Sequence, residues 1–396
     1  MQTYSNKELS EEYIDWPVYI RRSIELAQNA ITATPNPRVG CVLVKSGSVI
    51  AEGWHVAAGA VHAEIMALES AGENAQGAVA FVSLEPCSHT GRTGPCCDAL
   101  IAVGISTVVV AGIDPDPRVS GKGVKALEAA GISVFHLVDF EDVARAVNPG
   151  YFKRLETGLP YVRCKLAMSL DGRTALANGA SKWITGTAAR ADVQTLRAGS
   201  CAVVTGIGTV LADDPAMNVR PHELDLAVSF REHNKLALDK QPLRVVLDSQ
   251  LRIPDAAKII VTAGAVKIYT AEVGADSKRF PDNVEIIAAP MPAVGKGREA
   301  SVSLRTVLKS LASDYACNEV LVEAGSTLSA AFVQSGLVDE LVVYIAPRLL
   351  GSDGKALLEL SGIQSLADSV DFLVEDLTKV GGDIKVTLVP AVSADR

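Results

Sequence analysis

The sequence predicts two α/β domains in one chain, and three observations lead to this fold class. The chain has 396 residues, more than one average domain holds. Helical and strand patterns alternate along both halves, which is typical of sheets covered by helices on both faces. The alternation breaks over residues 148–160, where Asn-Pro-Gly is followed by Thr-Gly-Leu-Pro. We therefore predict domains at 1–157 and 158–396.

The elements of the first domain follow from the spacing of apolar residues. Residues 17–33 show the helical period, and further helices are expected at about 62–71, 96–103 and 123–130. Strands are expected at 39–44, 49–51, 78–84, 107–111 and 132–137, the first two as a hairpin around Ser46-Gly47.

The second domain repeats the alternation of strands and helices. Residues 221–241 form a polar insertion with no clear period. The expected helices are 187–198, 302–313 and 326–335. The expected strands are 161–168, 201–205, 244–248, 258–262, 319–323, 340–346 and 384–389.

Composition and charge limit the classes of function. The net charge is -9, so the chain repels a phosphate backbone and nucleic acid is a poor partner. The polar N-terminus shows no export signal, and no apolar run is long enough to span a bilayer. Three of the seven cysteines fall between Cys87 and Cys97, which in a cytoplasmic protein favours metal binding or catalysis over disulfides.

A metal centre is predicted from His62, Glu64, Cys87 and Cys96. One imidazole and two thiolates give Zn²⁺ three ligands and leave the fourth position open, as catalytic zinc requires. Glu64 can then carry a proton from the attacking water to a leaving amine. Because residues two apart diverge inside a helix, His62 and Glu64 can share a site only at a first helical turn. Each motif alone is common in surface pairs or buried thiols, but their combination in this order favours the metal centre.

The spacing of the cysteines separates two classes of zinc deaminase. Nucleic-acid deaminases use Pro-Cys-x-x-Cys, whereas Cys96 lies nine positions after Cys87. The segment 86–97 resembles the pyrimidine deaminase of bacterial riboflavin biosynthesis. The resemblance implies a cytidine-deaminase-like α/β/α sandwich, with Cys96 as the ligand and Cys97 as a packing residue. It also implies that Asn36, in the loop 34–40, hydrogen-bonds the pyrimidine, with His55, His89 and Arg92 as further substrate contacts.

The second half resembles the reductase that follows this deaminase in the same pathway. The similarity lies in residues 165–172, 181–185, 203–215 and 322–328. It implies a dihydrofolate-reductase-like α/β domain that uses NADPH without a flavin.

Glycine-containing turns give independent but modest support for nucleotide binding. Gly206 and Gly208 follow a predicted strand, but the third glycine of a dinucleotide fingerprint is missing. Residues 321–327 are better placed, because free N–H groups at a helix start form an anion site. Ala324 stands where the family usually has a glycine, and a methyl group there crowds a close backbone approach unless φ is negative.

The resemblance assigns contacts in the second domain residue by residue. The substrate contacts are Ser181, Arg197, Met217, Arg220 and Glu323, of which the arginines suit a ribose phosphate. Arg197 could instead complement a helix dipole. The proton of the reduction is expected from water or Glu323. The NADPH contacts are Ala167, Trp183, Thr209, Asp213, Gly325, Ser326, Thr327, Leu328, Ser329, Ala330 and Ala331.

The sequence thus predicts a cytoplasmic, bifunctional enzyme of riboflavin biosynthesis that acts on small phosphorylated pyrimidines. The resemblance also implies a homo-oligomer, most simply a dimer. Two alternatives remain: a nucleic-acid-editing deaminase, which predicts a basic channel with aromatic residues, and a deaminase whose C-terminal half is a non-catalytic oligomerisation or ligand-sensing module.

Overall fold

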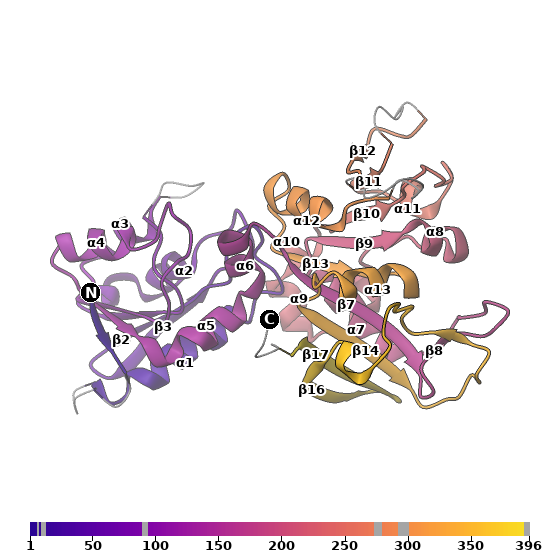
Figure 1. The fold of residues 1–396 in the computed structure, drawn as a ribbon. Coiled ribbons are helices and arrows are strands. Elements are labelled where there is room, and N and C mark those ends of the chain that lie inside the picture. Colours follow the sequence, from indigo (N-terminus) through magenta and orange to yellow (C-terminus); the bar gives the residue numbers. More distant parts are fainter. Residues whose placement is uncertain (6–7, 9–12, 89–93, 273–278, 292–300, 392–396) are drawn as a thin grey trace. The chain divides into compact units, whose positions relative to one another are not determined.

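The computed structural model describes residues 1–5, 8, 13–88, 94–272, 279–291 and 301–391. The chain divides into two compact units (Figure 1). Unit 1 comprises residues 1–157 and 227–239, and unit 2 comprises residues 158–226 and 240–396. No helix within the described ranges is long and apolar enough to cross a membrane.

Unit 1 is built on a six-stranded sheet in the order β1-β6-β5-β4-β2-β3. The first four are parallel, and β2 and β3 form an antiparallel hairpin at one edge. Ser46 and Gly47 both have positive φ, which matches the twist of a tight hairpin. The strands are β1 (Gln2–Tyr4), β2 (Gly40–Lys45), β3 (Ser48–Trp54), β4 (Val79–Val82), β5 (Thr107–Val110) and β6 (Ser133–Leu137).

Helices cover both faces of this sheet, which makes unit 1 an α/β/α sandwich. On one face, α1 and α5 bury Trp16, Ile20 and Val147 against the strands. On the other face, α2, α3 and α4 bury Ala67, Leu100 and other small apolar residues. The helices are α1 (Trp16–Ala27), α2 (Ala63–Ala71), α3 (Cys96–Val103), α4 (Lys122–Ala129), α5 (Glu141–Val147) and α6 (Pro149–Thr157).

Residues 227–239 differ from the sequence prediction, which placed them in the second domain. They form α9 (Val228–His233) and α10 (Lys235–Leu238), which belong to unit 1. The buried Asn234 amide donates to the Asn29 carbonyl at 2.7 Å and accepts from the Ile31 N–H at 2.7 Å. These bonds engage the backbone just after α1, which ends at Ala27 and not at residue 33 as expected.

Unit 2 is built on a nine-stranded sheet in the order β12-β11-β10-β9-β13-β7-β14-β17-β16. All pairs are parallel except those made by β17 and β16. The strands are β7 (Tyr161–Ser169), β9 (Ala202–Gly206), β10 (Leu243–Leu247), β11 (Val266–Thr270), β12 (Val284–Ala288), β13 (Glu319–Val322), β14 (Glu340–Ala346), β16 (Phe372–Val380) and β17 (Asp383–Pro390). A small separate sheet pairs β8 (Arg173–Ala175) with β15 (Lys355–Ala356).

The strand predicted at 258–262 was wrong, because this segment forms the single helical turn α11 (Lys258–Val261). Three consecutive apolar residues fit a buried helical turn as well as a strand. The sequence prediction also missed β11, β12 and β16.

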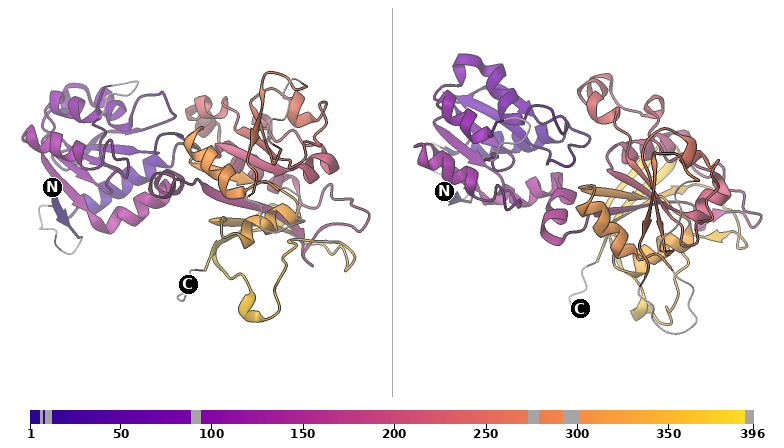
Figure 2. Two further views of the ribbon diagram at one scale, coloured as in Figure 1. Left: turned by 45° about the horizontal axis from the view of Figure 1, so that its top comes forward. Right: turned by 90° about the horizontal axis from the view of Figure 1, so that it is seen from above.

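Helices lie on both faces of the unit 2 sheet (Figure 2). α12 and α13 cover one face, and α7, α8 and α11 cover the other. Because the parallel strands share one direction, residues at their carboxyl ends meet at one edge of the sheet. The helices are α7 (Thr187–Ala198), α8 (Ile207–Asp213), α11, α12 (Leu304–Ser313) and α13 (Ser326–Gln334).

Candidate functional site

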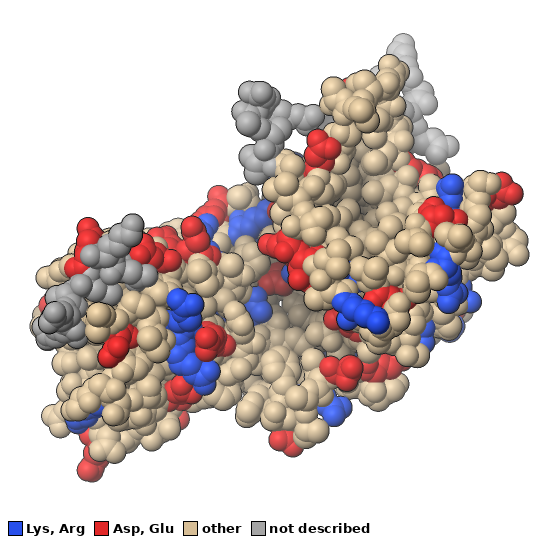
Figure 3. All heavy atoms as spheres, turned by 90° about the horizontal axis from the view of Figure 1, so that it is seen from below, with Lys and Arg blue, Asp and Glu red and all other residues tan. Residues whose placement is uncertain are grey.

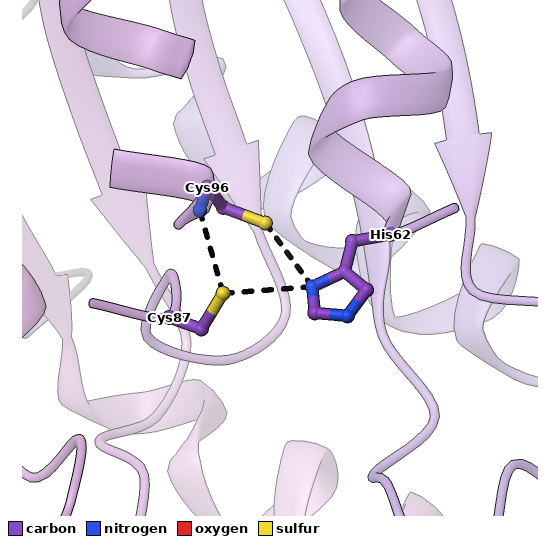
Figure 4. Close-up of side chains that lie close together, drawn as sticks. All are labelled: His62, Cys87 and Cys96. Atoms are coloured by element: carbon purple, nitrogen blue, oxygen red, sulfur yellow. Dashed lines mark hydrogen bonds between the residues drawn. The ribbon is translucent and has the colours of Figure 1, made fainter. Parts of the chain in front are cut away.

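The structure brings His62, Cys87 and Cys96 together in unit 1 (Figure 4). His62 Nδ1 lies 3.2 Å from Cys96 Sγ and 3.5 Å from Cys87 Sγ. The three ligand atoms all lie within 4.8 Å of one another, the only such group among the described residues.

Secondary structure places each member of this group. His62 is the N-cap of α2, and Cys96 is the first residue of α3. Cys87 follows β4, and its sulfur accepts the Cys96 N–H at 3.3 Å. Strand β3 approaches the start of α2 so closely that a Cβ on Gly53 would lie 2.3 Å from the Ala63 carbonyl oxygen. A side chain at this glycine would therefore displace the helix that presents His62.

The group fits Zn²⁺. Tetrahedral zinc, with bonds of about 2.3 Å to sulfur and about 2.0 Å to nitrogen, holds these two atoms about 3.5 Å apart. The two N···S distances are close to this value. Hydrogen bonds from Cys96 and His62 also lower the pKa of the Cys87 thiol to about 4, so it is present as the thiolate that binds metal.

Glu64 lies in the first turn of α2, where it can share the site with His62. Its side chain is only 4% exposed. Burial and the nearby Cys87 thiolate raise the pKa of Glu64 to about 7, although His62 opposes the shift. A carboxyl group with a pKa near neutrality can both accept and release a proton.

Cys97 is not a member of the metal group. Its thiol donates to the Pro86 carbonyl oxygen at 3.3 Å, and its side chain belongs to the core beneath α3 and α4. A Cβ on Gly123 would lie 3.1 Å from its sulfur, so α4 packs tightly against this thiol.

Asn36 and His55 form a hydrogen-bonded chain near the metal group. His55 Nδ1 lies 2.9 Å from the Val61 carbonyl oxygen, and its Nε2 lies 3.1 Å from the Asn36 amide nitrogen. His55 therefore donates to Val61 and accepts from Asn36, as a neutral imidazole. Burial lowers the pKa of His55, which favours this neutral form. The predicted contacts His89 and Arg92 lie outside the described residues.

Unit 2 contains a large cleft of about 1890 Å³ at the carboxyl ends of its parallel strands. All five predicted substrate contacts line it. So do nine of the predicted NADPH contacts, whereas Ser329 and Ala330 are buried in α13 and do not.

Arg197 and Glu323 form an ion pair in the wall of the cleft. The pair is bidentate and each side chain is 10% exposed. Burial alone would raise the pKa of Glu323, but the charges of Arg197 and Lys165 lower it. Arg197 is thus engaged by Glu323 rather than by the carbonyl end of its own helix.

Lys165 is a functional candidate that the sequence analysis did not single out. It lies on β7, lines the cleft, and has no hydrogen bond to its ammonium group among the described residues. Burial lowers its pKa, in opposition to the charge of Glu323. The sequence did contain a signal for this residue, because a lysine is unusual on a central parallel strand, which is normally apolar.

Arg220 and Met217 lie on the loop after α8. Arg220 pairs with Glu223, at 2.5 Å and 2.8 Å, and its N–H donates to the Gln194 side chain. Met217 is buried with a φ of 52°, a conformation that costs a non-glycine residue free energy and is common at binding sites.

The donor set around α13 fits the phosphates of a dinucleotide. Gly325 is the N-cap, no side chain caps the helix, and its first turn has no acidic residue. The free N–H groups of such a turn attract anions. Ala324 does not have a positive φ, so its methyl group is accommodated where the family usually has a glycine.

Family models match both units. The cytidine and deoxycytidylate deaminase zinc-binding region matches residues 17–112, and the RibD C-terminal domain matches residues 160–386. The chain belongs to the RibD family. It is 46% identical over 376 residues to the riboflavin biosynthesis protein RibD of Escherichia coli, covering 94% of this chain and 99% of that one. With the RibD of Haemophilus influenzae it shares 45% identity, covering 94% and 97%.

Solved RibD structures show the same fold. A structure of Acinetobacter baumannii RibD matches with a TM-score of 0.83 and 42% identity, covering 95% of this chain and 98% of that one. A diaminohydroxyphosphoribosylaminopyrimidine deaminase/5-amino-6-(5-phosphoribosylamino)uracil reductase from Thermotoga maritima matches with a TM-score of 0.79 and 30% identity, covering 96% and 100%. The predicted fold class, a cytidine-deaminase-like domain followed by a dihydrofolate-reductase-like domain, is confirmed.

RibD membership also confirms the predicted type of enzyme. The chain is a hydrolase and an oxidoreductase of riboflavin biosynthesis, with Zn²⁺ and NADPH as its cofactors. This favours a catalytic second unit over an oligomerisation or ligand-sensing module. A nucleic-acid partner would require a basic patch. On the face drawn in Figure 3, the described Lys and Arg residues are instead interspersed with Asp and Glu.

Proposed function

We propose that unit 1 hydrolyses the exocyclic amine of 2,5-diamino-6-(5-phosphoribosylamino)pyrimidin-4-one. The observation that carries this proposal is the group His62, Cys87 and Cys96 beside the buried carboxyl of Glu64. These three residues would hold the zinc ion, which on binding would lower the pKa of a water molecule towards neutrality.

Glu64 moves the proton, and Asn36 orients the ring. The Glu64 carboxylate takes a proton from the attacking water and delivers it to the amine nitrogen that leaves as ammonia. Asn36 donates to His55 with one of its amide hydrogens, which fixes the amide plane and leaves its oxygen and second hydrogen for the pyrimidine. His55 acts as a positioning residue, and His89 and Arg92 remain proposed substrate contacts.

Replacing Glu64 tests the deaminase mechanism. Glu64→Gln keeps the side-chain shape but cannot carry the proton, so we expect a loss of deamination of about 10²–10⁴-fold. Zinc content, measured by native mass spectrometry, should be unchanged because Glu64 is not a ligand. Full activity with zinc bound would remove Glu64 from its role.

We propose that unit 2 then reduces the ribosyl group of 5-amino-6-(5-phosphoribosylamino)uracil to ribityl. NADPH supplies a hydride when bound, and the cleft residues orient both molecules. The substrate contacts are Ser181, Arg197, Met217, Arg220 and Glu323. The cofactor contacts are Ala167, Trp183, Thr209, Asp213, Gly325, Ser326, Thr327, Leu328 and Ala331, and the buried Ser329 and Ala330 are left out of this set.

Lys165 is the proposed proton donor of this step. Reduction adds a hydride to the anomeric carbon and needs a proton on the ring oxygen that leaves it. The Lys165 ammonium lines the cleft, and the carboxylate of Glu323 favours its charged form. Its lowered pKa also makes it a stronger acid than an exposed lysine.

The two proposed steps can be tested in one assay. The deaminase substrate is added to the zinc-loaded chain with NADPH, and ammonia and NADPH oxidation are recorded together. Both should appear, and NADPH oxidation should require prior deamination. Ammonia release without NADPH oxidation in a folded chain would leave only the deaminase.

We further propose that the protein is a cytoplasmic homodimer. Within the described residues, which include all seven cysteines, no disulfide forms, and this suits thiolate ligands in a reducing compartment. Strand β16 is the edge of the nine-stranded sheet and exposes Leu373, Val374 and Leu377. An exposed apolar edge favours pairing with a second copy. A dimer mass in light scattering that falls to the monomer in Leu377→Lys would support this assembly, and a monomeric wild-type chain would refute it.

A further inference from the structure

The first turn of α13 already holds an anion that comes from the chain itself. Glu359 Oε1 accepts from the Ser326 hydroxyl at 2.8 Å, and Oε2 accepts from the Thr327 hydroxyl at 2.8 Å. Both hydroxyls belong to the proposed cofactor contacts, and Glu359 lines the same cleft. The carboxylate therefore lies at the helix end that attracts phosphate.

The backbone that carries Glu359 is anchored on both sides. Leu358 and Leu360 pack against the core beneath α13. The Ser361 carbonyl oxygen accepts from the Gln334 side chain at 2.7 Å, and β15 pairs with β8 before the segment begins. The Glu359 side chain itself is exposed, so it can turn away from the helix while its backbone stays in place.

A carboxylate and a phosphate cannot share this position without repulsion. Each favours the same free N–H groups and the same two hydroxyls, and like charges at such short range oppose each other. The first turn of α13 has no other acidic residue, so Glu359 alone supplies this negative charge among the described residues that bond to the turn.

We propose that Glu359 is a resident anion of the cofactor site, which a phosphate of NADPH must displace. The residue thereby sets the affinity for the cofactor: its bonds to Ser326 and Thr327 must be broken before the phosphate binds. This inference rests on the proposed binding of NADPH along α13. It assigns to Glu359 a role in cofactor affinity, not in the chemical step.

Binding of NADP⁺ to Glu359→Gln tests the inference. The amide keeps the length of the side chain but removes its charge, so displacement becomes easier. We expect the Kd for NADP⁺, measured by calorimetry on the zinc-loaded full chain, to fall about fivefold, because a charge at a helix end contributes on the order of 1 kcal/mol. Adenosine, which has no phosphate, should bind wild type and variant equally.

Two matched variants complete the experiment. Glu73→Gln removes an exposed carboxylate of unit 1 and should leave the Kd unchanged. Glu359→Asp keeps the charge but shortens the reach by one methylene, so it should tighten binding less than Glu359→Gln.

The outcomes separate this inference from the proposed function. If wild type binds NADP⁺ and Glu359→Gln binds it equally or more weakly, Glu359 is only a cap of α13 and the inference is overturned. An equal gain in Glu73→Gln would also overturn it, because the effect would then be one of net charge. If wild type binds no NADP⁺, the proposed reductase function fails, and this inference fails with it.

Discussion

Arg197 and Glu323 join α7 to the end of β13 through two parallel hydrogen bonds. Arg197 Nε lies 2.5 Å from Glu323 Oε1, and Nη2 lies 2.9 Å from Oε2. A third guanidinium bond reaches the Asn218 carbonyl oxygen at 3.1 Å. The pair thus fixes one wall of the cleft and keeps two buried charges mutually neutralised, so its loss should affect both stability and reduction.

Glu323→Gln should destabilise unit 2 and weaken the reductase. The variant leaves the buried charge of Arg197 without its counter-ion, which costs about 3–5 kcal/mol. We expect a lower melting temperature for unit 2 and slower NADPH oxidation, with ammonia release by unit 1 unchanged. Calorimetry of the full chain and the two-product assay measure these effects.

Arg220→Gln is the matched control for a broken ion pair. Arg220 and Glu223 also form a bidentate pair, but each side chain is 36% exposed. Exposed pairs contribute about 0–1 kcal/mol, so the melting temperature should hardly change. A large loss of stability in this control, or none in Glu323→Gln, would contradict the assignment of the buried pair.

Lys165→Met should abolish reduction while NADP⁺ still binds. Loss of a positioned proton donor typically slows a reaction about 10²–10⁴-fold. In the wild type, the charged groups that face Lys165 are Glu323 and Arg197, and the Tyr344 ring lies 5.7 Å from its ammonium. The donor must be protonated, so kcat for reduction should decline as the pH rises through the pKa of Lys165. Because burial lowers this pKa, the decline should begin at a lower pH than it would for an exposed lysine.

Lys165→Arg separates proton donation from charge. Arginine keeps the positive charge but does not release its proton, so reduction should stay slow and the decline with pH should vanish. Normal kcat in either variant would show that the proton comes from elsewhere.

The metal group was predictable because its geometry is local. His62 and Glu64 stand at the start of one helix, and Cys96 stands at the start of another, so spacing and first-turn positions suffice to place them. The hairpin at Ser46-Gly47 is local in the same sense, because its turn residues carry the information.

The remaining features depend on contacts between distant segments. Glu359 lies 32 residues beyond Thr327, and no pattern in the sequence links them. Residues 258–261 and 266–270 are both short apolar runs, and only the second pairs with β10. The first therefore forms a helical turn and the second forms strand β11. The sequence likewise gives no sign that Asn234 bonds to the backbone beyond α1 in unit 1. Tertiary packing decides each of these.

Metal content should distinguish the two adjacent cysteines. Cys96→Ser removes a thiolate ligand and should release zinc, whereas Cys97→Ser changes only a buried thiol and should retain it. Native mass spectrometry of both variants gives the number of zinc ions per chain. Deaminase activity should be retained only in the variant that keeps its zinc. The reverse pattern would assign the ligand to Cys97.

A buried carboxyl group should make the stability of unit 1 depend on pH. Burial raises the pKa of Asp114 to about 6. The Asp116 N–H and the Tyr151 hydroxyl oppose this shift by donating to the carboxylate at 2.8 Å and 2.9 Å, whereas the negative charges of Asp116 and Glu85 add to it. A carboxyl group with a raised pKa stabilises the folded state at low pH, and this contribution is lost as the pH rises through about 6.

Asp114→Asn should therefore stabilise unit 1 at neutral and higher pH. The amide oxygen still accepts from Tyr151 but carries no charge, so the free energy of unfolding should rise by about 1–2 kcal/mol near pH 8 and change little near pH 4. Glu69→Gln removes an exposed carboxylate of α2 and should show no such dependence on pH. Calorimetry of the zinc-loaded chain at the two pH values measures the difference. A gain at pH 4 equal to that at pH 8 would assign the effect to packing and not to the charge of Asp114.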